Sequence, residues 1–342
     1  MVAVGYFWSP GYRDLVLFRV LSGVGAAMVV PIAFSYIGDL APRGYEGRYM
    51  GLFNIAMIAG FGIGPVLGGV IYDSLGMDAT FVGMGVLSIL GLGIVFFFLP
   101  RRTPSLRVTS SPGVTEFEEP SNSFVSMLRN ATMRGILTFQ LASGLLYGTV
   151  LAFVGVWMTT VLHTSVAQVG AVLSARAIIN GALAYPFGWL ADRMNRVILI
   201  SASMVMVAIG TFSIPWLGSF PLLLGLFMVI GIFESLAAPS VTAIAVERGR
   251  GMGMGSVMGV FNMAGSLGML TGSMAGGVIQ SSMGIVAVFR CAAALGLVGV
   301  VVFNVFMLRS ARLSKESLAV LQPSAPDPAS EELADAPHKQ KH

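Results

Sequence analysis

Four charged residues stand inside long apolar runs of this sequence: Arg19, Arg176, Glu234 and Arg290. A charge at mid-membrane costs roughly 2.5–3.5 kcal/mol on insertion scales, so each is a candidate functional residue. Arg176 and Glu234 lie deepest, each about 15–18 Å from one end of its predicted helix. At equal depth the two side chains can pair. Only the acid can cycle a proton near neutral pH, because arginine stays charged. The chemistry open to the pair is proton coupling, with a static ion pair as the alternative.

The two shallower arginines have a second interpretation. Arg19 and Arg290 lie four to five residues into their predicted helices, close enough for the side chains to reach the membrane surface. For Arg290 this explanation is favoured. For Arg19 a role in proton coupling stays open.

Neutral polar residues near the deep charges form a weaker set. Gln140 and Tyr147 are seven residues apart and therefore share one helix face, and Asn180 lies one turn from Arg176. These three either line a substrate cavity or form hydrogen bonds between helices. The sequence contains no phosphate-binding loop, metal-ligand cluster or nucleophile–base pair, so we expect no enzyme, no metal and no cofactor.

Composition determines which elements carry these residues. Of the 342 residues 55% are apolar and 11% are charged, and the mean hydropathy is +0.82. A soluble domain of this length has about 25% charged residues, so this chain must face lipid, and helices of about 20 apolar residues are expected. Nine spans are predicted, over residues 15–38, 49–72, 79–99, 135–160, 166–190, 197–216, 222–245, 253–279 and 285–308.

Two polar stretches separate and follow these spans. Residues 100–134 are rich in Pro, Ser and charge and are predicted to be a linker between bundles, and residues 309–342 a disordered tail. Most Lys and Arg residues fall on the side of the membrane that holds both stretches, which assigns that side to the cytoplasm. We expect a multi-pass protein of the cell (inner) membrane, without nucleic acid as a partner.

An internal repeat sets the organisation of the spans. Residues 50–76 and 258–284 align without a gap at an offset of 208 residues, with 13 of 27 positions identical. The copies lie six helices apart, as in transporters built from parallel six-helix units. The second unit, 135–308, has six helices, whereas residues 1–99 hold three and the stub of another. We therefore expect about three further helices before Met1. A natural nine-helix protein is the alternative.

The repeat carries a specific motif. Its glycines and proline have the spacing of the fifth-helix antiporter motif of the major facilitator superfamily, as found in drug:proton exchangers, which this sequence resembles. The matching residues are Gly51, Gly60, Gly64, Pro65, Gly68 and Gly69. The segment "LVLFRVLSGVGAA" resembles the fourth-helix motif, with Arg19 as its arginine. The segment "GWLADRMNR" resembles the loop motif between helices eight and nine, through Gly188, Asp192, Arg193 and Arg196, with Asn195 in place of a glycine.

This resemblance implies an all-α polytopic membrane protein of the major facilitator type, in which nine of twelve helices are present as helices four to twelve. In the family, helix five lies beside helix eight, so Gly60, Gly64 and Gly68 are expected to face a small-residue stripe at Ala177, Gly181 and Ala184. Helices eight and ten line the cavity, which makes Arg176 and Glu234 candidates for proton coupling.

The implied function is secondary transport, in the form of proton-coupled efflux of a small lipophilic or cationic molecule by alternating access, as in multidrug resistance. The partners are that small molecule, protons and the lipid bilayer, and a monomer is expected. Uptake of a sugar or organic acid is the alternative within transport. A non-transporting membrane fragment is the alternative outside it.

Overall fold

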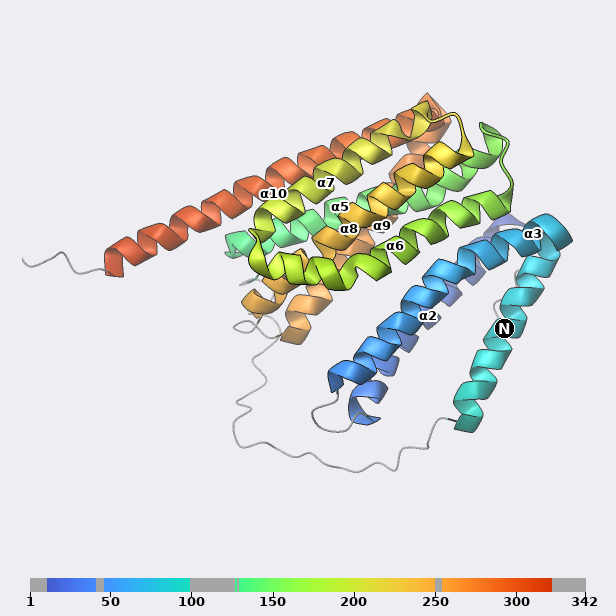
Figure 1. Cartoon of the computed structure of the whole chain (residues 1–342), viewed down its shortest axis with the longest axis horizontal. Helices are drawn as coiled ribbons and strands as arrows, with labels where there is room; N and C mark the ends of the chain where they lie inside the picture. The colour runs from blue at the N-terminus through green and yellow to red at the C-terminus, as the bar shows by residue number, and fades with distance from the viewer. Residues whose placement is uncertain (1–10, 41–45, 99–126, 128, 250–253, 322–342) are drawn as a thin grey trace, which may run out of the picture.

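The computed structural model describes residues 11–40, 46–98, 127, 129–249 and 254–321. These residues form helices and no β-strand, which confirms the all-α fold class. The helices are α2 (Tyr12–Leu40), α3 (Glu46–Phe98), α5 (Ala131–Thr160), α6 (Val166–Arg193), α7 (Arg196–Ser213), the short 3₁₀ helix η1 (Ile214–Trp216), α8 (Phe220–Gly249), α9 (Met254–Met283) and α10 (Ile285–Leu321) (Figure 1).

Two repeat-related glycines make the same turn. Gly76 interrupts α3 with φ 86°, and Gly284 separates α9 from α10 with φ 84°. Glycine adopts positive φ at little cost because it has no Cβ atom. When α3 is divided at Gly76, the described part of the chain holds nine long helical segments, one for each predicted span. Without that division, six helices of the described residues are long and apolar enough to cross a membrane, by length and composition alone, and one of them is Ile55–Phe98.

The helix ends differ from the prediction at two places. Asn130 caps α5 by accepting hydrogen bonds from the backbone N–H groups of Thr132 (3.0 Å) and Met133 (3.4 Å), so the helix begins at Ala131 rather than 135. The expectation of a disordered tail from residue 309 is wrong for residues 309–321, where α10 continues to Leu321. This stretch is rich in Ala, Leu, Arg, Lys and Glu, which favour helix even where the sequence is polar.

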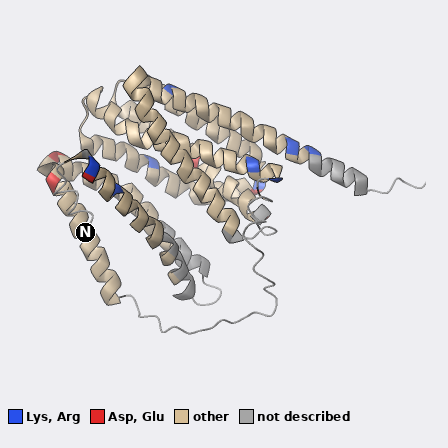
Figure 2. Cartoon of the chain, turned by 180° about the vertical axis from the view of Figure 1, so that it is seen from behind, with Lys and Arg blue, Asp and Glu red and all other residues tan. Residues whose placement is uncertain are grey.

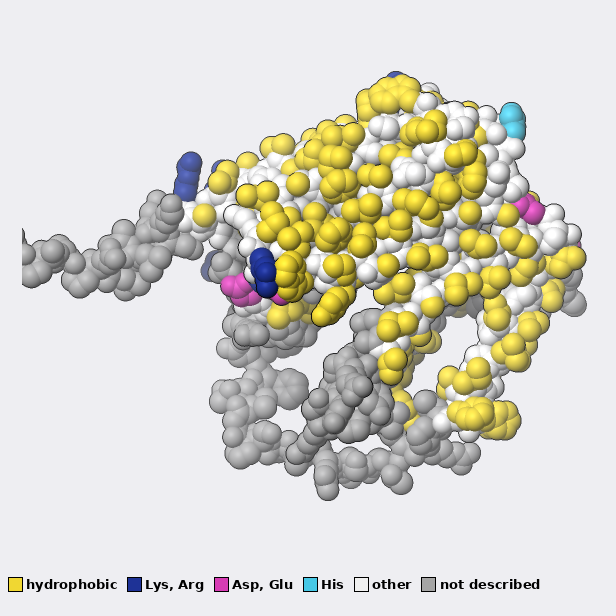
Figure 3. Space-filling model, viewed as in Figure 1, with side chains coloured by type: hydrophobic (Ala, Val, Ile, Leu, Met, Phe, Trp, Pro, Cys, Tyr) yellow, Lys and Arg dark blue, Asp and Glu magenta, His cyan; other side chains and the backbone are white. Residues whose placement is uncertain are grey.

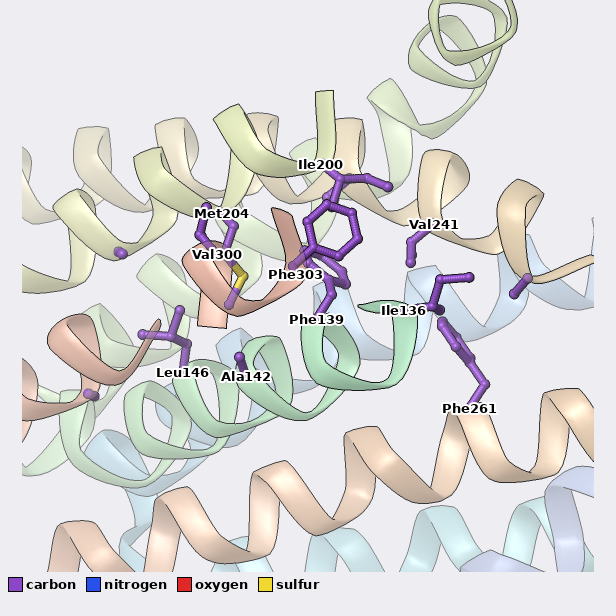
Figure 4. Packing of buried hydrophobic residues seen from close by; sticks show 14 residues of the cluster. Ile136, Phe139, Ala142, Leu146, Ile200, Met204, Val241, Phe261, Val300 and Phe303 are labelled. Atoms are coloured by element: carbon purple, nitrogen blue, oxygen red, sulfur yellow. The ribbon is translucent and has the colours of Figure 1, made fainter. Parts of the chain in front are cut away.

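The six helices α5–α10 form one bundle (Figure 1). Small residues bring α5 and α9 into backbone contact, since a Cβ atom at Gly144 or Gly148 would overlap backbone atoms of Gly265 or Met269. On the other side of α5, Phe139 packs against Phe303 of α10 with ring centroids 5.9 Å apart, in the apolar cluster of Figure 4. The bundle is therefore closely packed around α5.

Helices α2 and α3 lie beside this bundle, with α3 packed against α6 (Figure 1). Most large apolar side chains of α2 and α3 are exposed, and apolar side chains also cover much of the bundle face in Figure 3. Charged residues of the described part gather mainly near helix ends (Figure 2). A long uncharged surface of this kind is what a bilayer requires.

Several predicted segments lie outside the described residues. They are the helical stub at 1–10, most of the linker predicted at 100–134, and the tail after Leu321.

Candidate functional site

Arg176 of α6 and Glu234 of α8 form a two-pronged ion pair. Nε of Arg176 donates to Oε2 of Glu234 at 2.8 Å, and the second guanidinium nitrogen, Nη2, donates to Oε1. The side chains are 6% and 22% exposed. Such bidentate pairing fixes geometry as well as charge. The two residues that sequence depth alone suggested as partners are thus in contact.

A glycine on α8 lets α6 and α8 come close enough for the ion pair to form. Gly231 lies about one turn before Glu234, and a Cβ atom there would stand 2.7 Å from the carbonyl oxygen of Arg176. The absence of a side chain lets α6 and α8 approach with their backbones close together. The pair is therefore positioned by helix packing as well as by its own attraction.

Aromatic rings enclose the guanidinium group. The Cζ atom of Arg176 lies 4.7 Å from the ring centroid of Tyr147 and 6.0 Å from that of Phe227. A cation over an aromatic face is stabilised by the ring quadrupole. Arg176 therefore keeps favourable partners apart from Glu234.

A cavity of about 440 Å³ lies next to the pair, between α5, α6, α7, α8 and α9. Four residues proposed from sequence line it: Gln140, Tyr147, Asn180 and Glu234. Arg176 does not line it, so Glu234 is the charged residue among the described ones that face the cavity. Most of the remaining wall is apolar, with side chains such as Phe139, Met204, Val241 and Phe261. A mostly apolar pocket with a few polar groups is the usual form of a small-molecule site.

The contribution of α7 to this cavity was not anticipated from sequence. Ser203, Met204 and Val207 all line it. The sequence of α7 is almost uniformly apolar and gives no sign of which face meets a cavity. Ser203 is one of several small polar residues in this helix, with Ser201, Thr211 and Ser213, and nothing in the sequence singles it out.

The contact between α3 and α6 uses a different glycine face from the one expected. A Cβ atom at Gly69 would lie 2.6 Å from the carbonyl oxygen of Val166, and one at Gly170 would overlap the backbone of Pro65. On the α6 stripe, Gly181 packs on Ile58. The expectation that Gly60, Gly64 and Gly68 face α6 is wrong, since a Cβ atom at each would meet nothing within 4 Å.

Helical geometry explains why the predicted glycine face does not meet α6. Residues spaced by four define one face of a helix, but the spacing does not say which neighbour that face meets. In the second copy of the repeat, Gly268, Gly272 and Gly276 occupy the positions of Gly60, Gly64 and Gly68, and they pack on α5. The face towards α6 is instead formed around Gly62, Pro65 and Gly69.

An acidic residue at the end of this contact was also missed. Asp73 of α3 accepts hydrogen bonds from the backbone N–H groups of Val166 (3.0 Å) and Ala167 (2.7 Å) at the start of α6. A carboxylate at a helix N-terminus satisfies N–H groups that have no partner within the helix. Asp73 therefore caps α6 from a different helix, where Gly69 brings the two backbones together.

The loop motif between α6 and α7 joins three helices. Arg196 donates to Asp192 at 3.4 Å and to Glu247 of α8 at 3.2 Å, while Arg193 lies over the ring of Trp189 at 3.8 Å. Asn195 replaces the motif's glycine and caps α7 by accepting from the N–H of Val197. Gly188 lies near Pro239, with 3.9 Å between its Cβ position and the proline ring.

The remaining site candidates lie apart from the cavity. Arg19 is exposed on α2 and does not line it. Gly51 belongs to α3, but its surroundings lie outside what the structure describes. Within the described residues, no group of three His, Cys, Asp or Glu side chains could hold a metal ion.

Comparison with known proteins places these features in a family. The chain is 25% identical over 285 residues to an uncharacterised MFS-type transporter of Methanocaldococcus jannaschii, which covers 82% of this chain and 71% of the relative. It is 24% identical over 325 residues to the synaptic vesicular amine transporter of Mus musculus, covering 93% and 60%. A 4-hydroxybenzoate transporter of Acinetobacter baylyi is 26% identical over 258 residues, covering 65% and 55%.

All three relatives are named as transporters, and the matches cover between 65% and 93% of this chain. The family model named Major Facilitator Superfamily matches residues 1–161 and 136–335. Together with the helices and the internal repeat, these matches show that the chain belongs to the Major Facilitator Superfamily.

Proposed function

We propose that this protein is a secondary transporter that exports a small lipophilic cation in exchange for protons, by alternating access. The observation that carries the proposal is the position of Glu234, whose carboxylate lines the cavity while its partner Arg176 lies behind it. A cavity that presents a negative group and covers the positive one favours a cation. This arrangement argues against organic acids, and the mostly apolar wall argues against sugars.

The proton and the substrate compete for one carboxylate in this scheme. When Glu234 is ionised it attracts a cationic substrate as well as Arg176. When Glu234 takes up a proton that attraction is lost and the substrate is released. Arg176 then keeps its contacts with the rings of Tyr147 and Phe227, which lowers the cost of losing its ionic partner. A repeated cycle exchanges protons for substrate.

Access to the two sides of the membrane requires one group of helices to move against another. The contact between α3 and α6, built on Gly69, Gly170 and Pro65, supports such motion because backbone contacts without long side chains can rock. The bundle α5–α10 moves as a unit in this scheme, because its apolar core is closely packed. We expect the open face of Gly60, Gly64 and Gly68 to receive a helix as α9 receives α5.

The proposal is tested by transport in proteoliposomes, with ethidium as a fluorescent lipophilic cation. An acid-inside pH gradient should drive ethidium accumulation by the wild type, and collapse of the gradient should stop it. Glu234→Gln should lose this pH-driven accumulation. Glu247→Gln is the matched control, since Glu247 is an exposed acid on the same helix that pairs with Arg196, and it should retain transport.

Two results would contradict the proposal. The first is normal gradient-driven accumulation by Glu234→Gln. The second is transport of 4-hydroxybenzoate, an organic anion, without any transport of ethidium.

A further inference from the structure

One buried hydroxyl group of the cavity wall has no partner among the described residues. Ser203 of α7 is fully buried, its Oγ atom makes no hydrogen bond, and the residue lines the cavity. Buried polar groups are nearly always paired, and an exception next to a cavity indicates a bound water or ligand group. Ser203 therefore differs from an ordinary serine in an apolar helix.

Three other hydroxyl groups of the same bundle, unlike that of Ser203, donate hydrogen bonds to their own helices. Ser143, which lines the same cavity, donates to the carbonyl oxygen of Gln140 at 3.1 Å. Thr211 on α7 and Ser240 on α8 donate to their own helices at 2.9 and 3.0 Å. Their hydrogen bonds are satisfied locally. The hydroxyl of Ser203 has no such local partner.

The register of α7 against α8 gives the depth of this hydroxyl. The helices are antiparallel, and Gly210 of α7 lies against Ile230 of α8, with its Cβ position 2.9 Å from the isoleucine side chain. Seven residues back along α7 and seven forward along α8 bring Ser203 level with Ala237, which also lines the cavity. Ala237 follows Glu234 by three residues, about 4.5 Å along the axis. In depth along the helices, Ser203 thus lies about one turn from Glu234.

Apolar side chains of the cavity wall, such as Phe139, Met204 and Val241, share that wall with polar ones that include Gln140 and Thr242. Ser203 differs from these polar groups because its hydroxyl is buried and unpaired. A buried hydrogen-bonding group of this kind discriminates strongly, because a ligand that lacks the matching group leaves it unpaired. We propose that Ser203 is a specificity-determining residue that hydrogen-bonds a hydroxyl group of the substrate, whose cationic end lies at Glu234. The assignment of the cationic end rests on the proposed function.

Paired ligands that differ by one hydroxyl group test this proposal. The probes are tyramine and phenethylamine, and affinity is measured on the purified full chain in lipid nanodiscs. The wild type should bind tyramine about five- to tenfold more tightly, as one hydrogen bond allows. Ser203→Ala should remove this preference by weakening tyramine alone. Ser174→Ala is the control, because its hydroxyl is also buried and unpaired but does not line the cavity.

The outcomes separate this proposal from the function on which it rests. If both amines bind and depend on Glu234, but Ser203→Ala keeps the wild-type ratio or no preference exists, the role of Ser203 is wrong and the cation site stands. If neither amine binds, the cation site is wrong, and cysteine labelling decides whether Ser203 faces a ligand. In a Cys291→Ala background, Ser203→Cys should react with a small methanethiosulfonate and Ser174→Cys should not. Absence of reaction at position 203 overturns the proposal.

Discussion

The Nε atom of Arg176 on α6 lies 2.8 Å from the Oε2 atom of Glu234 on α8. Of these two residues, Glu234 lines the neighbouring cavity and Arg176 does not. This relationship joins two helices deep inside the bundle and leaves an acid facing the space where a substrate fits. It therefore combines a structural contact with a group that can exchange a proton.

The structural part of the pair is tested by removing each partner. Arg176→Ala leaves a mostly buried carboxylate without its ion and should destabilise the protein by about 3 kcal/mol or less, given that Glu234 is partly exposed. The double variant Arg176→Ala with Glu234→Gln should regain most of that stability, because no unpaired charge stays buried. Melting curves in detergent measure both effects.

Transport by the same double variant separates structure from coupling. It should stay inactive in gradient-driven transport even though it is stable, because Gln cannot carry a proton. A double variant that recovers transport together with stability would make the pair purely structural.

The contact between α3 and α6 is tested with two glycines of one helix. Gly69→Ala places a Cβ atom 2.6 Å from a backbone oxygen of α6, which cannot move aside easily, so the helices should separate locally. Gly64→Ala adds a methyl group where nothing lies within 4 Å. Hydrogen exchange at the amides of Val166 and Ala167 should therefore accelerate in Gly69→Ala alone. Equal exchange in both variants would show that Gly69 does not set this contact.

The cap provided by Asp73 is tested by chemical labelling. Asp73→Ala removes the acceptor for two N–H groups of α6, so the first turn of that helix should open more often. Labelling of Ala167→Cys in a Cys291→Ala background by an impermeant maleimide should become faster. Asp78→Ala, which removes an exposed acid beyond Gly76, should leave the rate unchanged. An unchanged rate in Asp73→Ala would exclude a stabilising cap.

The need for glycine at the turn between α9 and α10 is tested by comparing Gly284 with a glycine inside α9. Gly284→Ala forces a side chain into positive φ and should lower stability by about 1–2 kcal/mol. Gly277→Ala, on the neighbouring helix α9 with open space at its Cβ position, should be neutral or slightly stabilising. The order of their melting temperatures measures the difference, and the reverse order would mean that the turn does not need glycine.

Much of the fold could be predicted because membrane helices are marked by simple features. Apolar length, end charges and turn sequences located all nine helical segments, and Gly76 and Gly284 mark equivalent turns of the repeat. The Arg176–Glu234 contact was predictable too. An unpaired charge in the membrane is costly, so two opposite charges at equal depth are expected to pair.

The unpredicted features depend on how helices are rotated against their neighbours. The spacing of Gly60, Gly64 and Gly68 defines a face without naming its partner, and the partner was wrongly assigned. Ser203 looks in sequence like any serine that bonds to its own helix. Only the packing of α7 against the cavity distinguishes it.

Proton release on substrate binding tests the central role of Glu234 most directly. Tetraphenylphosphonium is a suitable probe because it is a permanent cation with no proton of its own. When it is added to the purified full chain in weakly buffered detergent solution at a series of pH values, we expect a pH-sensitive dye to report proton release that saturates with binding in part of that series. Glu234→Gln should release none, and Glu247→Gln should behave like the wild type. Equal proton release from Glu234→Gln and the wild type, or wild-type binding without any release, would contradict proton exchange at Glu234.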